Sequence, residues 1–510
     1  MTRVDRLFCR AAPAALILLA ALAAGFPAGR AHASPRHGQL QAEPAPATSL
    51  VGGVAIPFEF DPPRKQFIVV KARLNGRGRP LAFIVDTGAS FPIIFDNEAA
   101  RRLKLPLEGR TGTVNEHVQA AGVKVSRFSL QAEHGWYDRI GDTDNGLSAI
   151  MTDLSVLRTV GTTRSDIVGI VGWPFFLHTT FQIDFDQKRL TIWDAPTPQA
   201  AFPGSITSRI AIARDGFHAG IRLESGDAAA PLIDTGSYDS AVPLALGQKL
   251  NPLATRMVED AGIGSFGLSP RWLLRTIIVG GFRERDVAVT AAQTEHLVRL
   301  GMDIVARYNM LFDPRRHTIT LVRRSDPTAI IRPLGCSGVQ LAEVPGGRLL
   351  IASVAPGSPA SLARLRRGDE ILSVDDVNLK GLTVITAGAV VDGSEGVQEM
   401  LRVRFADGET LVVPLTPTSE FNRPPTVWVG LAFRKVENEQ MVVLDVRPNS
   451  LADRAGIRAG DHIVKIEGRE TQNLAFNDFH LADLFGRVTL EVQHPDSDQT
   501  RTVVLALRGP

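Results

Sequence analysis

The pattern of apolar and polar residues in this chain occurs twice between residues 64 and 325, once in 64–195 and once in 205–325. Each copy begins with an alternating segment, a glycine-containing turn and an uninterrupted apolar run, which together predict a β-hairpin. The predicted strands are Gln66 to Leu74 and Leu81 to Val85 in the first copy, and Phe217 to Leu223 and Ala230 to Ile233 in the second.

The two copies also end alike. An apolar pair, or nearly a pair, precedes Gly172 in the first copy and Gly301 in the second. An aspartate follows each glycine at the same spacing of twelve residues, Asp184 and Asp313, and a closing strand comes next. A shared spacing of this length indicates an internal repeat.

A second repeat follows, in 330–418 and 425–510, at a constant offset of 92 residues. Pro356 matches Pro448, Ser358 matches Ser450, and Gly368-Asp369 matches Gly460-Asp461. Proline-rich stretches separate the parts, at 195–198, 326–327 and 423–425. The pattern therefore predicts four mainly β domains, in agreement with a soft prior of about 150 residues per domain for a chain of 510.

The candidate chemistry lies at the end of two predicted strands. Asp86-Thr87-Gly88 and Asp234-Thr235-Gly236 each follow an apolar run directly. Burying an ionised carboxylate costs several kcal/mol unless partners compensate, so finding this arrangement twice suggests that the two acids meet. The alternative is that both aspartates only cap turns at the ends of their strands.

These residues resemble the retropepsin-like and pepsin-like aspartic proteases, over both copies in residues 64–325. The resemblance implies a bilobal double β-barrel with lobe 1 at 64–195 and lobe 2 at 205–325. Each lobe is expected to supply one catalytic aspartate, with the glycine after the apolar pair behind it in a psi-shaped strand crossing. The second copy departs from this pattern, because Arg299 precedes Leu300 where an apolar residue is expected.

The implied chemistry is peptide hydrolysis by water. Asp86 and Asp234 would share one proton, because two neighbouring carboxyls repel each other when both are ionised. The aspartic proteases are the established example of this effect on the pKa values of a carboxyl pair. The ionised carboxyl acts as general base on the water and the protonated one polarises the carbonyl. In the family, the hydroxyls of the two threonines lock the loops beneath the carboxyls. The dyad-supporting residues are Thr87, Gly88, Thr235, Gly236 and Ser237.

Ser237 introduces an asymmetry between the two loops, because Ala89 has the equivalent position in the first copy. A hydroxyl that donates to Asp234 would favour its ionised form. The hypothesis is therefore that Asp234 is the more readily ionised acid and that Asp86 more often carries the proton.

Two segments are candidates for flaps over the cleft, residues 110–120 in the first copy and 262–267 in the second. The tyrosine of pepsin-type flaps is missing from both, so ordinary surface loops are the alternative. Because one chain carries both acids, the sequence favours a monomer, which avoids the loss of translational freedom on association. A homodimer that pairs each lobe with that of a second chain is the alternative.

The second repeat resembles a pair of PDZ domains, at 330–418 and 425–510. In such domains, successive backbone amides of a glycine-containing loop bind a chain-terminal carboxylate, and the peptide adds a strand to the sheet edge. In the second copy a groove helix is expected at Asn477 to Phe485. In the first copy the corresponding segment, Leu382 to Gly396, contains several glycines and β-branched residues where the resemblance implies a helix, so a rearranged or closed groove is an alternative there. A spacer that binds nothing is the alternative. The candidate loops are Gly338, Val339, Gln340 and Leu341, and Gly430, Leu431, Ala432 and Phe433.

The composition and the N-terminal segment add expectations about partners, export and cofactors. The net charge is +2, from 56 basic and 54 acidic residues, which argues against a nucleic-acid-binding surface. Arg3, Arg6 and Arg10 precede an apolar run, and Ala31-His32-Ala33 supplies small residues, so a signal peptide at 1–33 is expected, cleaved after Ala33, with no membrane span afterwards. Residues 34–63 predict a flexible leader. The mature chain keeps one cysteine, Cys336, and no disulfide, metal site or cofactor is expected.

Two functions are compatible with these features. The first is an exported, periplasmic or secreted aspartic endopeptidase that acts on peptides or unfolded proteins, with PDZ domains that bind C-terminal peptides and recruit or regulate substrates. The second is an inactive, protease-shaped adaptor or sensor that binds peptides in the periplasm. Two retained Asp-Thr-Gly sequences favour the enzyme, because an inactive cleft has no physical need for two buried acids.

Overall fold

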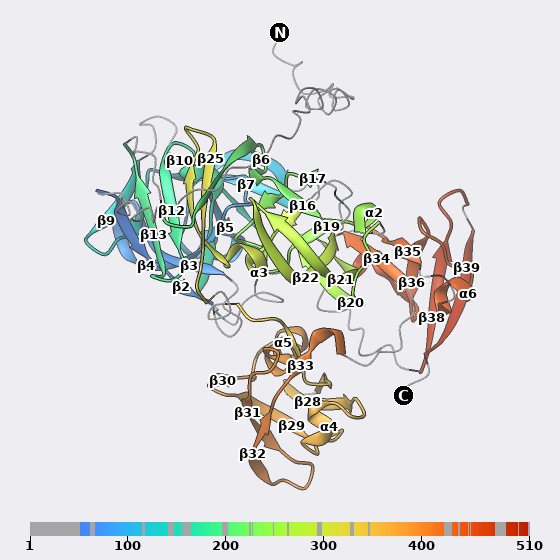
Figure 1. The fold of residues 1–510 in the computed structure, drawn as a ribbon. Coiled ribbons are helices and arrows are strands. Elements are labelled where there is room, and N and C mark those ends of the chain that lie inside the picture. The colour runs from blue at the N-terminus through green and yellow to red at the C-terminus, as the bar shows by residue number, and fades with distance from the viewer. Residues whose placement is uncertain are drawn as a thin grey trace, which may run out of the picture. The chain divides into compact units, whose positions relative to one another are not determined.

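The structure is a computed structural model that describes residues 52–507 with gaps, and residues 47–510 form one compact unit. Strands dominate the ribbon in Figure 1, and the predicted mainly β fold with a bilobal protease part and two PDZ-like parts is confirmed. The expected signal peptide lies outside the described residues. The gaps are 62–66, 115–117, 141–146, 155–156, 158–163, 165, 196–201, 224–225, 227, 248, 263–264, 293–297, 327–330, 345–346, 423–430, 437–438, 447, 449, 475–485 and 498.

The first lobe is built on a β-hairpin whose second strand ends in Asp86. β3 (Ile68–Leu74) and β4 (Arg77–Asp86) pair antiparallel around Asn75 and Gly76, both in left-handed conformations that an Asn-Gly turn adopts readily. The hairpin predicted from the apolar pattern is therefore present. The other elements are β5 (Ile93–Asp96), α1 (Asn97–Arg102), β6 (Leu107–Val114), β7 (Val118–Val125), β8 (Arg127–Gln131), β9 (Trp136–Ile140), β10 (Leu147–Thr152), β11 (Ile167–Gly172), a 3-10 helix (Trp173–Phe176), β12 (Thr180–Asp184) and β13 (Arg189–Trp193).

The second lobe has the same plan with shorter strands before Asp234. The segment Phe217 to Leu223 is divided at Gly220, where one strand had been expected. The elements are β14 (Ile206–Ala213), β15 (Gly216–Ala219), β16 (Ile221–Leu223), β17 (Ala228–Ala229), β18 (Leu232–Ile233), β19 (Ala241–Pro243), α2 (Leu244–Gly247), β20 (Ala254–Gly262), β21 (Ser265–Val279), β22 (Phe282–Ala292), β23 (Arg299–Leu300), α3 (Met302–Val305), β24 (Tyr308–Asp313) and β25 (Thr318–Arg323).

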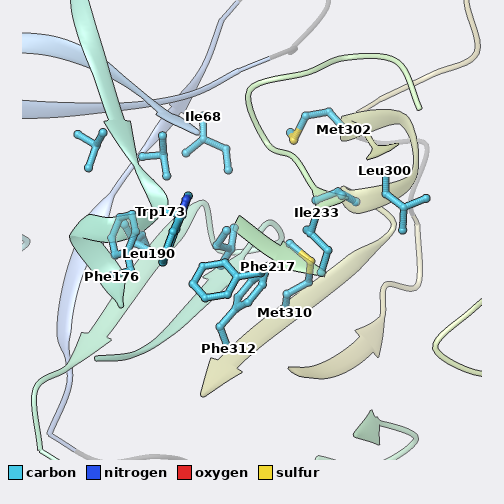
Figure 2. Packing of buried hydrophobic residues seen from close by; sticks show 14 of the residues in the cluster. Ile68, Trp173, Phe176, Leu190, Phe217, Ile233, Leu300, Met302, Met310 and Phe312 are labelled. Carbon is cyan, nitrogen blue, oxygen red and sulfur yellow. The ribbon is translucent and has the colours of Figure 1, made fainter. Parts of the chain in front are cut away.

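The two lobes share one sheet and one hydrophobic core. β12 of lobe 1 pairs antiparallel with β24 of lobe 2, and Phe181 stacks on Phe312 at 4.6 Å between ring centroids. Figure 2 shows Phe312 beside Phe217, and the Trp173 ring packs edge-on against Phe217 at 5.6 Å. Large aromatic side chains of both lobes are thus buried together, which holds the two Asp-Thr-Gly loops on a common base.

The aspartates found at the repeated spacing of twelve residues have a local structural role. Asp184 Oδ1 accepts a hydrogen bond from the amide of Gln187, and Asp313 Oδ1 accepts one from the amide of Arg316. Each carboxylate closes the tight turn between the last two strands of its lobe, β12–β13 or β24–β25. The conserved spacing between the two copies therefore reflects turn geometry.

Ordered strands begin before the predicted boundary at residue 64. β1 (Val54–Pro57) pairs with β13, and β2 (Glu59–Phe60) pairs with β3. Ile56 and Phe58 are buried in the core of lobe 1. This burial offsets the chain entropy that is lost when the segment becomes ordered, although the composition of the leader had predicted flexibility. The end of the expected flexible leader is therefore part of the protease fold.

The first PDZ-like part contains the helix that the PDZ resemblance implied and that its local composition argued against. α5 (Val384–Asp392) begins at Thr383, whose hydroxyl accepts from the amide of Thr386, and ends at Gly393 with φ of 53°. Ala387, Val390 and Val391 of this helix are buried in the core of the domain, so tertiary packing outweighs the low helix propensity of its β-branched residues. The other elements are β26 (Gly335–Cys336), β27 (Val339–Val344), β28 (Arg348–Val354), α4 (Pro359–Leu362), β29 (Glu370–Val374), β30 (Val377–Asn378), β31 (Glu399–Arg404), β32 (Thr410–Leu415), β33 (Thr418–Ser419) and a 3-10 helix (Glu420–Asn422).

The second PDZ-like part has matching local features at the offset of 92. Ser358 and Ser450 both cap short helices, and Asp369 and Asp461 both accept from a backbone amide three residues earlier. The expected groove helix at 477–485 lies outside the described residues. The elements are β34 (Leu431–Val436), β35 (Met441–Val446), α6 (Leu451–Arg454), β36 (His462–Ile466), β37 (Arg469–Glu470), a 3-10 helix (Thr471–Asn473), β38 (Gly486–Gln493) and β39 (Thr500–Leu507).

Candidate active site

Each Asp-Thr-Gly loop leaves a strand that is paired in parallel with the segment carrying the glycine of the same lobe. In lobe 1, Asp86 ends β4 opposite Gly172 of β11. In lobe 2, the amide of Asp234 donates to the carbonyl of Leu300 at 2.9 Å, next to Gly301. A Cβ on either glycine would fall within 2.6 Å of backbone atoms of its own loop, so glycine is required for the loop to pack there.

The two loops are bound to each other by the threonines. The Thr87 hydroxyl donates to the carbonyl of Ile233 at 2.6 Å and accepts from the amide of Thr235 at 3.1 Å. Reciprocally, the Thr235 hydroxyl donates to the carbonyl of Val85 at 2.8 Å and accepts from the amide of Thr87 at 3.0 Å. Both threonines are fully buried, so four hydrogen bonds hold loops 148 residues apart within one chain.

The two glycines bring each loop under the carboxylate of the other lobe. A Cβ on Gly88 would lie 2.7 Å from the carboxyl carbon of Asp234, and one on Gly236 would lie 2.1 Å from that of Asp86. The amide of Gly88 donates to Asp86 Oδ1 at 2.8 Å, and that of Gly236 donates to Asp234 Oδ1 at 2.9 Å. The structure therefore places the two predicted acids face to face in a nearly symmetric arrangement.

The environment of Asp86 favours its protonated form. Burial raises the pKa of this carboxyl well above its ordinary value, and the negative charge of Asp234 and a hydrogen bond with Asp234 raise it further. The backbone amides of Gly88 and Ala89 act in the opposite direction and do not outweigh these effects. A carboxyl in this position can retain a proton at a pH at which an exposed aspartate has lost it.

Ser237 does not make the contact expected of it. Its hydroxyl donates instead to the carbonyl of Asp239 at 3.1 Å. The side chain that does lie beside Asp234 is Arg299, whose Nε is 3.7 Å from Asp234 Oδ2. The sequence marked Arg299 only as a departure from an apolar pair and gave no indication of this contact.

A buried charge network lies beyond the second loop and was not predicted. Arg271 donates to Glu420 at 3.0 Å, to Asp239 at 2.8 Å and to Thr290 at 2.8 Å. Glu420 lies at the end of the first PDZ-like part, so residues 149 positions apart form this ion pair. No sequence motif could have indicated it, because single charged residues at such a separation carry no pattern.

Asp303 extends this network toward the loop. Its Oδ1 accepts from the amide and the hydroxyl of Ser240, at 3.0 and 2.6 Å. Burial, followed by the charge of Asp239, raises the pKa of Asp303 to about 6 in spite of Arg271 and the Ser240 bonds. A cavity of about 680 Å³ is lined by Arg271, Asp303 and Glu420 among others, and neither Asp86 nor Asp234 lines it.

Both candidate flaps form hairpins. β6 pairs with β7 across 111–121, and β20 pairs with β21 across 254–273. The lobe 2 hairpin has a second partner, because β21 also pairs antiparallel with β34 of the second PDZ-like part, in the register Ser265 to Val436 through Leu268 to Phe433.

The candidate PDZ residues lie at the start of β27 in the first copy, which is an edge strand among the described strands, and of β34 in the second copy, which is paired with both β35 and β21. The side chains of Val339, Leu341, Leu431 and Phe433 are buried in the domain cores, so only backbone groups of these residues can serve a ligand. Gln340 is partly buried, Gly338 has φ of 79°, Ala432 lies in β34, and Gly430 lies outside the described residues. Both strands, β27 and β34, carry a β-bulge at the same repeat position, after Gln340 and after Ala432.

The next two observations, on metal-binding groups and on membrane-spanning helices, hold for the residues that the structure describes. Among them, no group of three or more His, Cys, Asp or Glu side chains is arranged to hold a metal ion. Within 52–507, outside the gaps, no helix has the length and apolar character needed to cross a membrane.

Comparison with known proteins assigns both parts of the chain. An aspartyl protease family model matches residues 70–175, which include Asp86, and a PDZ domain model matches 350–404 and 442–492. Asp234 lies outside the matched protease segment, and its assignment depends on the geometry described above.

The curated relatives align with about a quarter to a third of this chain. Protease RseP of Yersinia pestis is 29% identical over 139 residues, which are 25% of this chain and 29% of that protein. The regulator of sigma-E protease RseP of Salmonella typhimurium is 26% identical over 165 residues, or 31% of this chain and 36% of that protein. The chain therefore spans only about a third of the length of these relatives.

Among solved structures, the basic 7S globulin from soybean is 12% identical and aligns with a TM-score of 0.34, over 54% of this chain and 96% of that chain. A photosystem II D1 C-terminal processing protease aligns with a TM-score of 0.17 and 20% identity, over 22% and 29% of the two chains. Neither likeness is strong enough to bear on the assignment. The family matches show that this chain carries an aspartyl protease domain followed by two PDZ domains.

Proposed function

We propose that the protein is an aspartic endopeptidase whose Asp86 and Asp234 activate water to hydrolyse peptide bonds. The observation that carries this proposal is the reciprocal bonding of Thr87 and Thr235, which supports a dyad formed within one chain. An adaptor that only binds peptides would have no use for two acids held against each other at the cost of burying charge.

In the proposed reaction, a water molecule between the two carboxyls attacks the carbonyl carbon of the substrate. Asp234, ionised, takes a proton from this water as general base. Asp86, protonated, donates its proton to the carbonyl oxygen, so that a neutral tetrahedral diol forms. Asp234 then gives its proton to the leaving nitrogen while Asp86 takes one from a diol hydroxyl, so that the C–N bond breaks, a carboxylic acid and an amine form, and the starting protonation state returns. The raised pKa of Asp86 supports this division of roles, although the dyad titrates as a unit.

The test is cleavage of a denatured protein substrate at acidic and neutral pH, with and without pepstatin. We expect Asp86→Asn and Asp234→Asn each to abolish turnover, because either change removes the shared proton chemistry. Asp376→Asn is the matched control, since Asp376 is exposed on the first PDZ domain. Unchanged cleavage by Asp86→Asn would exclude this mechanism and leave the peptide-binding adaptor as the function.

An intrachain dyad makes a monomer sufficient for activity. Specific activity should then be constant on dilution, and light scattering should show one chain per particle at concentrations where the enzyme works. Activity that falls with dilution would instead indicate that lobes of two chains combine.

We further propose that the PDZ domains have different roles. In the first, β27 pairs with β28 alone among the described strands and α5 packs against β27, which leaves a strand edge for a C-terminal peptide. In the second, the corresponding edge of β34 is already paired with β21 of lobe 2. The second domain therefore restrains the β20–β21 hairpin, which is the candidate flap of lobe 2. The first domain recruits the substrate.

Export completes the proposal. The N-terminal segment with Arg3, Arg6 and Arg10 before an apolar run supports secretion to the periplasm or beyond, with cleavage after Ala33. Sequencing of the N-terminus of the mature protein should then begin at Ser34. Recovery of intact Met1 from the exported fraction would show that the segment is retained.

A further inference from the structure

Arg299 occupies in lobe 2 the strand position that Ile170 occupies in lobe 1. Each residue stands two positions before the glycine behind its loop, and each pairs with a residue two positions before the aspartate, Leu232 or Ile84. Ile170 is a buried apolar residue of the core. The nearly symmetric lobes therefore differ here by one positive charge.

The position of this charge is specific. Arg299 Nε lies 3.7 Å from Asp234 Oδ2, and the two side chains are 26% and 11% exposed. Nε is buried and makes no hydrogen bond in the described part of the chain. A guanidinium remains protonated at any pH the protein experiences, and burying one donor without a partner is costly. Packing does not require this arrangement, because lobe 1 fills the same position with isoleucine.

We propose that Arg299 is the positioning residue of the dyad, which keeps the negative charge on Asp234 and thereby leaves the shared proton on Asp86. This inference rests on the proposed function. A cation on one side of two coupled carboxyls stabilises the protonation state whose charge lies nearest to it. Arg299 thus supplies the asymmetry that the sequence had assigned to Ser237, whose hydroxyl is engaged with Asp239.

The other charged groups around the second loop have different partners. Asp86 faces Asp234 from lobe 1. Arg271 is bonded to Asp239 and Glu420, and Asp303 to Ser240. On β15, which pairs with β18, the His218 ring is bonded to Asp215 and to the carbonyl of Ala230. Of these groups, Arg299 is the cation that forms an ion pair with Asp234.

The first test is the pH profile of kcat/KM for Arg299→Met and Arg299→Lys. The dyad is active when one of its two carboxyls is ionised. Without the cation, this ionisation requires a higher pH. We therefore expect the acidic limb of the methionine variant to move up by about 1 pH unit or more. The lysine variant keeps the charge, so its limb should stay near that of the wild type whatever its kcat. Coincident acidic limbs for wild type and methionine variant, or a lysine variant that behaves like methionine, would overturn the proposal.

The second test does not depend on turnover. Thermal unfolding at pH 7 of the full chain is compared for Arg299→Met alone, Asp234→Asn alone and the two combined. If the pair interacts as proposed, the arginine change lowers Tm more in the wild-type background than in the Asp234→Asn background. An equal decrease of Tm in both backgrounds would show that Arg299 and Asp234 do not interact. Should Asp86→Asn retain turnover, the proposed function fails, and this cycle still decides whether Arg299 acts on Asp234.

Discussion

Gly236 lies so close to Asp86 that a Cβ on the glycine would fall 2.1 Å from the carboxyl carbon of the aspartate. The contact crosses from lobe 2 to lobe 1, and Gly88 makes the reciprocal contact with Asp234. The glycines of the two motifs are therefore needed for the acids to approach, and not only for the conformation of their own loops.

Gly236→Ala should abolish turnover, since the added methyl group must displace the Asp86 carboxyl. We expect a loss of stability of roughly 2 kcal/mol as well, as for an overfilled core. Gly220→Ala is the matched control in the same lobe, because a Cβ there meets no atom within 4 Å. Steady-state cleavage and urea unfolding of both variants are the measurements. Normal turnover by Gly236→Ala would mean that the carboxyl need not hold its position.

Thr235→Val removes the hydroxyl from a buried site while keeping its shape. The carbonyl of Val85 and the amide of Thr87 both lose their partner, which should cost about 2–4 kcal/mol in the free energy of unfolding. Thr235→Ser keeps both hydrogen bonds and should retain most of the stability. The valine variant should also lose activity, because the loops are no longer bound together. Equal stability of the serine and valine variants would show that the hydroxyl bonds contribute nothing.

The sequence was sufficient to indicate that Asp86 and Asp234 meet and insufficient to indicate which side chains surround them. Asp86 and Asp234 could be paired in advance because the same motif follows the same apolar pattern in two copies. The contacts of Arg299 and of Glu420 could not be predicted, because neither has a counterpart in the other copy: lobe 1 has Ile170 in place of Arg299, and no repeat relates Glu420 to Arg271. The local composition could not indicate the helix at 384–392 for a related reason: burial in the domain core decides its conformation.

Asp303 makes the stability of lobe 2 depend on pH. Its pKa is about 6 in the fold and near 3.8 when exposed, so between these values the folded chain holds a proton that the unfolded chain has lost. The resulting stabilisation is complete below about pH 4 and is lost as pH rises to about 6. Asp303→Asn, which imitates the protonated acid, should therefore be more stable than the wild type at pH 7 by up to about 3 kcal/mol.

This difference should shrink as pH falls from 6 to 4 and then vanish. Urea unfolding of the full chain at several pH values measures it, and Asp286→Asn, at an exposed position of β22 in the same lobe, is the control. A difference that stays constant over this range would place the titration on another group.

Glu420, at the end of the first PDZ-like part, is connected to the second Asp-Thr-Gly loop through Arg271 and Asp239. Glu420→Ala leaves a buried guanidinium with less compensation, which typically costs about 3–5 kcal/mol. We expect lower kcat together with the lost stability, because Asp239 belongs to the loop that follows Asp234. The exposed Glu409→Ala is the control. A variant that loses stability and keeps kcat would show that the network supports the fold without reaching the dyad.

The pairing of β21 with β34 predicts that the second PDZ domain binds C-terminal peptides weakly in the intact chain. Gly267 lies opposite Arg434 in this ladder, and proline there removes an amide donor and fixes φ. In Gly267→Pro, hydrogen exchange should become faster for the amides of β34 that face β21, while β35, which is paired within the domain, stays unchanged as the internal control. A peptide with an apolar C-terminus should bind the variant more tightly than the wild type, because the edge it would join is no longer occupied. If exchange and affinity are both unaltered, β21 does not close this edge, and the second domain must be assigned the same open role as the first.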